Sequence, residues 1–212
     1  MTNYEIRAKA RQDLGGKIFG SKWMMALAAY LIYSVIIGIC SFVPYVGSVA
    51  TFLLTGPLII GLFTFYVKLA RAEEAKIENL FDGFNDFVQN FLLQLMIGIF
   101  TFLWSLLFFI PGIVKSYSYS MAYYIKIDNP SYDWKTCIDE SKKRMDGHKW
   151  ELFCLHFSFI GWEILCCFTF GIGLLWLTPY MQAANANFYE AHIKIKDEPT
   201  TVEFINEETT EG

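Results

Sequence analysis

Charged residues are scarce in this sequence. Asp, Glu, Lys and Arg make up 18% of its 212 residues, whereas hydrophobic residues make up 54%, and the mean hydropathy is +0.34. Soluble domains carry about 25% charged residues, so this composition excludes an ordinary soluble domain of this size. The net charge is −4 and basic residues are interleaved with acidic ones, which argues against a nucleic-acid partner.

Motifs for catalysis and metal binding are also lacking. None of the five cysteines forms a C-x-x-C pair, and four of them lie inside apolar runs, so neither a disulfide framework nor a zinc site is indicated. His148, His156 and His192 form no His-x-x-x-His pattern, and no serine lies in a G-x-S-x-G motif. The sequence therefore predicts no catalytic residue, no metal site and no cofactor.

Long apolar runs are present instead. They extend over Trp23 to Val43, Val49 to Val67, Phe91 to Val114 and Leu152 to Leu177. Each approaches or exceeds the roughly 20 residues that a helix needs to cross a membrane. The first run is as long as a full span and no small-x-small site follows it, so it is not a cleavable signal peptide. These runs predict an all-α integral membrane protein.

An internal repeat organises the chain. Gly20, Gly83 and Gly147 are 63 and 64 residues apart, and a tryptophan follows the first and the last of them by three positions. Midway through each unit lies a cluster of helix breakers: PYVGS, IPGIVKS and FGIGLLWLTP. Each unit is therefore predicted to be a helical hairpin.

The three hairpins are predicted at about 21–68, 88–127 and 150–193, in a single transmembrane domain over 1–196. They give six membrane segments, of which the fourth is short and polar and is expected to pack inside the bundle or to start deeper in the membrane. An aromatic–tyrosine pair ends each hairpin, and we expect these rings in a half-wet interfacial belt. The pairs are Phe65-Tyr66, Tyr123-Tyr124 and Phe188-Tyr189.

The distribution of Lys and Arg predicts the orientation. Of the 17 basic residues, all but Lys115 lie before, between or after the hairpins. The positive-inside rule then places both termini in the cytoplasm. The connecting segments mix apolar and charged residues and are predicted to be amphipathic helices on the membrane surface, with solvated connectors as the alternative. Thr2 and Glu5 fit a capping box at the first of them, and the acidic tail 197–212 is predicted to be disordered.

One carboxylate lies inside an apolar run, in the stretch SFIGWEILCCF. Glu163 there must be protonated or paired, and we expect a buried polar cluster with Lys115, His156 and Tyr119. In one interpretation this cluster pins the second hairpin to the third. In the other it lines a path for a proton, an ion or a small solute, or binds a lipid head group.

A second set of residues in the third hairpin is predicted to govern helix packing and kinking. Gly161 places a close-contact site beside the ring of Trp162, and Pro179 bends the last segment beside Tyr180. Gly171 and Gly173 form the G-I-G at the turn, which follows no strand and is therefore assigned to kinking or packing rather than to nucleotide binding.

Several stretches resemble one known family. ESKKRMDGHKWELF, HFSFIGW, GIGLLWLTPY and A-x-x-N-F-Y in the third hairpin, with YEIRAKARQDLGG and LFDGF before it, are similar to the bacterial multi-pass membrane proteins catalogued as domain of unknown function 975. The resemblance implies a polytopic protein of the bacterial cytoplasmic membrane, with no established activity. The matching positions in the third hairpin are Glu140, Ser141, Gly147, Lys149, Phe153, Ser158, Gly161, Trp162, Gly171, Gly173, Trp176, Pro179, Tyr180, Phe188 and Tyr189.

The expected function is that of a non-enzymatic integral membrane protein. It would act through its membrane-embedded surface on membrane lipids, on another membrane protein or on a second copy of itself. The alternative is a small transporter or channel subunit whose polar path passes Glu163. Flux of a solute or of protons in proteoliposomes distinguishes the two.

Overall fold

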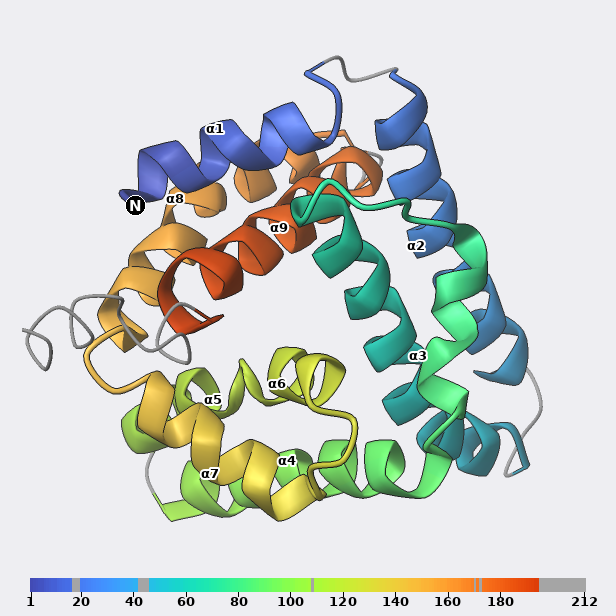
Figure 1. Ribbon diagram of the computed structural model, residues 1–212, viewed down its shortest axis with the longest axis vertical. Helices are drawn as coiled ribbons and strands as arrows, with labels where there is room; N and C mark the ends of the chain where they lie inside the picture. The colour runs from blue at the N-terminus through green and yellow to red at the C-terminus, as the bar shows by residue number, and fades with distance from the viewer. Residues whose placement is uncertain (17–19, 42–45, 108, 170, 172, 195–212) are drawn as a thin grey trace, which may run out of the picture.

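The computed structural model describes residues 1–16, 20–41, 46–107, 109–169, 171 and 173–194 (Figure 1). All regular structure within these ranges is helical, which confirms the all-α prediction. The predicted tail 197–212 lies outside the described residues.

The amino-terminal helix α1, Asn3–Asp13, begins at the predicted capping box. The Thr2 hydroxyl accepts a hydrogen bond from the Glu5 backbone amide, and the Glu5 carboxylate accepts one from the Thr2 amide. Ile6 and Ala10 on one face of α1 are fully buried, as is Leu14 just after it. This apolar face packs on the last long helix rather than facing outward.

Among the residues that the structure describes, three helices are long and apolar enough to cross a membrane. They are α2 (Ser21–Ser41), α3 (Val46–Ala70) and α4 (Phe87–Leu107), each apolar around most of its circumference. The shorter helices are α5 (Phe109–Tyr119), α6 (Ala122–Asp128), α7 (Trp134–Arg144), α8 (Lys149–Cys167) and α9 (Leu174–Phe188), which runs on into a π-helical turn, η2, at Tyr189–Ile193.

Consecutive helices lie beside one another. α2 contacts α3, α4 contacts α5, and α8 contacts α9. In Figure 1, α3, α6 and α9 surround the centre of the molecule, and α3 contacts both of the other two. The core is therefore built where α3, α6 and α9 meet.

The connector after α3 differs from the predicted amphipathic α-helix. It leaves α3 through Ala72, in the left-handed region at φ 57°, and ends in a 3-10 helix, η1, at Ile77–Phe84. η1 lies directly against the backbone of α3, with Leu80 over Gly61 and Gly83 over Pro57. Glycine at positions 61 and 83 makes this approach possible because it carries no Cβ atom.

The aromatic residues that end the hairpins are buried, so their prediction as half-wet interfacial rings was wrong for five of the six. Tyr66 and Tyr189 are completely buried, and Tyr124 is 2% exposed. Tyr124 stacks on Tyr189 at a ring-centroid distance of 5.2 Å and on Phe63 at 4.9 Å. These rings lie on the helices that face the centre, so protein rather than interface surrounds them.

The helix α7 also packs on protein. Its predicted apolar residues Cys137 and Ile138, and Met145 after it, are buried against neighbouring helices, and Arg144 is 6% exposed. The apolar side of α7 therefore packs on other helices of the bundle.

Candidate functional site

Glu163 and Lys115 do not form the predicted ion pair. Glu163 is half-buried near the end of α8, and the described residues include no hydrogen bond or ion pair between it and Lys115. The Lys115 ammonium instead lies 4.8 Å from the centre of the Trp104 ring. Trp104 belongs to α4, the helix packed on α5, so its negative π face is the nearer partner for this cation.

His156 does join hairpins two and three, but with other residues than those predicted. Its Nδ1 lies 3.3 Å from the Tyr117 hydroxyl of α5, and its Nε2 lies 2.9 Å from the Asn185 amide oxygen of α9. Tyr119 is buried elsewhere, beside Phe100. The predicted cluster is thus divided, and its bonded part, around His156, links three helices.

The predicted packing residues have mixed outcomes. Gly161 is exposed with no atom within 4 Å of a Cβ position, and Trp162 is 57% exposed, so no close contact forms there. Gly173 is tightly packed, since a Cβ atom would lie 2.6 Å from Cys166 Sγ.

The last helix contacts the amino-terminal one. Pro179 is buried inside α9, and Tyr180 donates a hydrogen bond to the Arg7 carbonyl oxygen at 3.3 Å. Gly171 has a positive φ of 82°, a conformation that favours glycine, just before α9.

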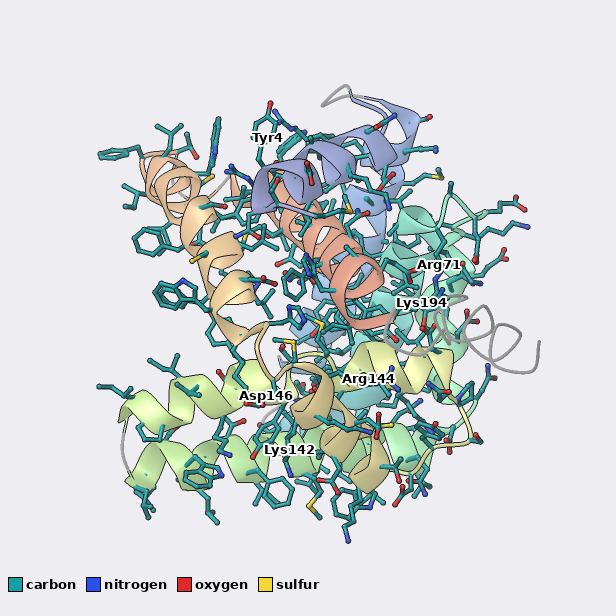
Figure 2. All side chains as sticks on the ribbon, turned by 60° about the vertical axis from the view of Figure 1, so that its left-hand side comes forward. Tyr4, Arg71, Lys142, Arg144, Asp146 and Lys194 are labelled. Carbon is teal, nitrogen blue, oxygen red and sulfur yellow. The ribbon has the colours of Figure 1, made fainter. Side chains whose placement is uncertain are left out.

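A partly buried ionic network, the Arg71 junction, joins segments that lie far apart in the sequence. Arg71, just after α3, donates hydrogen bonds to Asp128 Oδ1 at 2.5 Å and to Glu190 Oε1 at 2.7 Å. The Tyr189 hydroxyl donates to Asp128 Oδ2 at 2.8 Å, and the Lys194 ammonium lies 3.3 Å from Glu190. Figure 2 labels Arg71 and Lys194 on the same side of the molecule. The junction therefore connects α3, α6 and η2.

The partners of Arg71 stabilise its charged form. Burial lowers the pKa of the guanidinium, but the hydrogen bonds and charges of Asp128 and Glu190 outweigh burial and raise the pKa above its ordinary value. The sequence offered no signal for this network, because its members are separated by more than 50 residues and each resembles an ordinary surface charge.

A polar cavity of about 290 Å³, the Lys126 cavity, lies between α3 and the start of α4. The Lys126 ammonium donates to Asp86 at 2.6 Å and to the carbonyls of Pro130 and Tyr132 at 2.8 Å each. Asn90 is 3% exposed and donates to the Gly83 carbonyl, while its amide oxygen has no hydrogen-bond partner. The cavity is lined by Ile60, Thr64, Asp82, Asn85, Asp86, Asn90, Lys126, Ile127 and Pro130.

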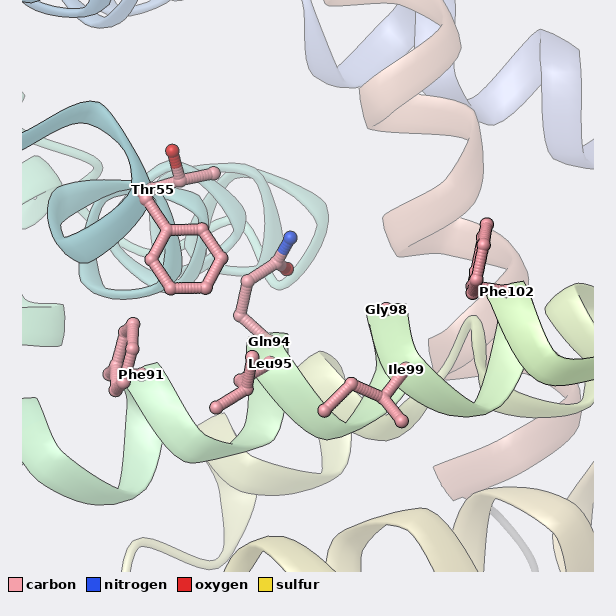
Figure 3. Close-up of a pocket in the computed structure, with 8 residues that line it drawn as sticks. Thr55, Phe91, Gln94, Leu95, Gly98, Ile99 and Phe102 are labelled. Carbon is pink, nitrogen blue, oxygen red and sulfur yellow. The ribbon is translucent and has the colours of Figure 1, made fainter. Parts of the chain in front are cut away.

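An apolar groove of about 310 Å³, the α3–α4 groove, lies between two of the helices that are able to span a membrane. Figure 3 shows its floor on α4, with Phe91 at one end, Phe102 at the other, and Gln94 pointing toward Thr55 of α3. The lining residues are Phe52, Thr55, Phe91, Gln94, Leu95, Gly98, Ile99 and Phe102.

The two polar side chains of the groove already have partners. The Thr55 hydroxyl donates to the Thr51 carbonyl at 2.5 Å, and Gln94 accepts a hydrogen bond from the Tyr123 hydroxyl. What the groove offers a ligand is therefore apolar surface.

A close helix contact lies between the groove and the Lys126 cavity. A Cβ atom on Gly56 would lie 2.7 Å from the Asn90 carbonyl oxygen and 3.0 Å from Phe91 Cα. Asn90 lines the cavity and Phe91 lines the groove. The interface of α3 and α4 thus has a polar recess on one side of this contact and an apolar one on the other.

The chain was compared with known proteins. A family model described as "Protein of unknown function (DUF975)" matches residues 1–115 and 108–196. No curated protein and no solved structure matches the chain.

Proposed function

The chain belongs to the DUF975 family of unknown function, and from that premise we propose that it is a multi-pass membrane protein that binds a lipid acyl chain in the α3–α4 groove. Its role is one of binding rather than catalysis. The proposed setting is the bacterial cytoplasmic membrane, in keeping with the resemblance of its motifs.

The proposed topology has six membrane segments in three hairpins, with both termini in the cytoplasm. Three apolar helices of sufficient length and the side-by-side pairs α2–α3, α4–α5 and α8–α9 support it. The Lys and Arg residues support the orientation, because all but Lys115 lie outside the hairpins or at their ends.

The observation that carries the proposal is the apolar lining of the groove, which lies between two helices that are able to span a membrane. Six of its eight residues have no polar side-chain atom, and the other two are already hydrogen-bonded. A volume of about 310 Å³ is at the small end of known ligand sites, which begin near 300 Å³. In a membrane, the abundant apolar ligand is the acyl chain.

Filling the groove tests the proposal. Gly98 lines the groove, and no described atom lies within 4 Å of its Cβ position, so Gly98→Leu starts a side chain in open space at the groove. Gly38→Leu is the matched control, because Gly38 lies exposed on α2 and also has open space around it.

Both variants and the unaltered chain would be reconstituted with a phospholipid that carries a photoreactive acyl chain, and the crosslinked peptides would be identified by mass spectrometry. We expect crosslinks on the lining segment 91–102, reduced about tenfold in Gly98→Leu, which corresponds to about 1.4 kcal/mol. Gly38→Leu should keep them. Equal labelling in both variants would show that the groove is not the binding site.

Transport of a small polar solute is the second candidate function. The Lys126 cavity supports it, since its lining of carboxylates, amides and an ammonium suits a polar solute. The path near Glu163 has less support, because Glu163 lines neither the groove nor this cavity. Solute flux into proteoliposomes that Lys126→Met abolishes and Glu163→Gln leaves intact would favour this candidate.

A further inference from the structure

Three potential metal-ligand side chains meet at the base of the third hairpin. His148 immediately precedes α8, Glu151 lies in its first turn, and His192 lies in η2. The Nδ1 atoms of His148 and His192 lie 2.7 Å and 3.4 Å from Glu151 Oε2, and one ligand atom from each residue lies within 4.8 Å of the others. All three side chains are half-buried.

The hydrogen bonding of His192 leaves Nδ1 as an acceptor close to the carboxylate. Its Nε2 lies 3.1 Å from the Met1 carbonyl oxygen, which can only accept, so Nε2 carries the proton. In the neutral imidazole Nδ1 then has no proton, and it lies 3.4 Å from an oxygen of Glu151. A cation shared by these two acceptors, either a proton or a metal ion, removes their repulsion.

The same arrangement is typical of metal-binding histidines. Such a histidine usually donates its second ring N–H to a carboxylate or a backbone carbonyl, which fixes the tautomer and the orientation of the ring. His192 has this bond to Met1, and its ring also stacks on Phe188 at 4.8 Å. The Asn3 amide donates to the Glu151 carbonyl at 3.1 Å and fixes the first turn of α8. Contacts outside the cluster therefore hold its members in place.

We propose that His148, Glu151 and His192 bind one divalent transition-metal ion, with Zn²⁺ as the best fit. Two imidazoles and one carboxylate form a common zinc ligand set, with a fourth position left for water. Zinc–ligand bonds of about 2.0–2.2 Å place tetrahedral donors about 3.3–3.6 Å apart. The His192–Glu151 separation of 3.4 Å already meets this. The His148–Glu151 contact of 2.7 Å has to lengthen by a small rotation of the carboxylate, and the two imidazole nitrogens, which lie within 4.8 Å of each other, have to meet the same range.

This site is independent of the lipid groove. It lies at the end of the third hairpin, whereas the groove lies between α3 and α4. A bound ion would tie the start of α8 to the end of the α9–η2 segment, beside the start of α1.

The test uses the full chain, purified in detergent with a histidine-free affinity tag and freed of metal with a chelator. Zn²⁺ would be titrated by calorimetry, and Co²⁺ by its visible absorption, which reports the coordination geometry. We expect one equivalent of either metal and a tetrahedral or five-coordinate Co²⁺ spectrum. His148→Ala and His192→Ala should each weaken Zn²⁺ binding by about 100-fold, the upper range for loss of even an outer partner.

His156→Gln is the matched control, because His156 is the one other histidine of the chain and its ring bonds to Tyr117 and Asn185 instead. Its Zn²⁺ affinity should stay within about twofold of the unaltered chain. Glu151→Gln keeps the shape of the site and should also weaken binding, which covers the case in which a histidine variant fails to fold. Absence of stoichiometric binding, an octahedral Co²⁺ spectrum, or equal affinity in Glu151→Gln would overturn the proposal.

Discussion

Gly83 packs on Pro57 so closely that a Cβ atom added to Gly83 would lie 2.0 Å from the Pro57 carbonyl oxygen. The neighbouring contact is equally tight, since a Cβ atom on Gly61 would lie 1.9 Å from the Leu80 carbonyl oxygen. Two backbones thus touch directly along this stretch of α3 and η1. This contact holds the 3-10 connector beside the Lys126 cavity, which Asp82 of η1 lines.

Alanine at position 83 is expected to destabilise the fold. Because the clash is with backbone rather than with a flexible side chain, η1 must move away from α3, at a cost of about 3 kcal/mol or more. Thermal unfolding in detergent, followed by circular dichroism, measures the loss. Gly38→Ala, at an open helical position, is the control and should raise stability by up to about 1 kcal/mol. An unchanged melting temperature in Gly83→Ala would contradict the tight contact.

Removal of the Arg71 guanidinium should cost more than removal of an exposed cation. Arg71→Ala leaves Asp128 and Glu190 partly buried without their partner, and we expect a loss of about 3 kcal/mol, at the low end for such pairs because the side chains are 15–21% exposed. Chemical denaturation in mixed micelles gives the free energy of unfolding.

Lys76→Ala provides the comparison for Arg71→Ala. Its ion pair with Glu74 joins side chains that are 55% and 80% exposed, so the loss should stay below about 1 kcal/mol. Similar losses for the two variants would mean that the Arg71 junction is no stronger than a surface ion pair.

Asp13 is expected to make stability depend on pH. Burial raises the pKa of its carboxyl, although the hydrogen bond from Asn187 and the charges of Lys9 and Lys22 act in the opposite direction. Since the folded-state pKa lies above the unfolded value, the contribution of Asp13 is fully present below about pH 3.8 and is lost as the pH rises through the folded-state pKa.

Asp13→Asn removes this titration. Relative to the variant, the unaltered chain should therefore lose stability between pH 3 and pH 7, as measured by melting temperatures of the two proteins in the same buffers. A difference that stays constant, or one that grows in the opposite direction, would show that Asp13 does not titrate in this way.

The proposed topology predicts opposite accessibility for two lysine positions. In a chain without its own cysteines, Lys115→Cys should react with a membrane-impermeant maleimide added to intact cells. Lys194→Cys should react only after the membrane is permeabilised. These outcomes follow from the proposed topology, in which Lys115 belongs to the breaker cluster IPGIVKS midway through the second hairpin and the other basic residues are cytoplasmic. Labelling of Lys194→Cys from outside would exclude six spans with cytoplasmic termini.

Local patterns predicted the local structure well. The capping box at Thr2, the buried apolar face of α1 and the glycine turn at Gly171 depend on residues a few positions apart, and the structure contains all three. Helical periodicity also identified the side of α7 that is buried at Cys137 and Ile138. It did not identify the partner of these faces, because an apolar stripe fits protein and membrane equally well.

The candidate sites depend on contacts that periodicity does not encode. His148 and His192 are distant in the sequence, and only the antiparallel pairing of α8 with α9 brings their rings to a centroid distance of 5.3 Å. Glu163 and Lys115 were expected to pair because Glu163 is a carboxylate inside an apolar run and Lys115 was the one cation not assigned to the cytoplasmic side. The choice of Trp104 over Glu163 as the partner of Lys115 depends on side-chain positions that only the folded helices define.

The charged residues of the Arg71 junction are also synthesised in a fixed order. Its three members follow one another as Arg71, Asp128 and Glu190, one near the end of each hairpin. A ribosome synthesises Glu190 after Arg71 and Asp128. Until Glu190 is in place, the Arg71 guanidinium lacks one of its two anions. The complete network therefore forms only when all three hairpins have packed together.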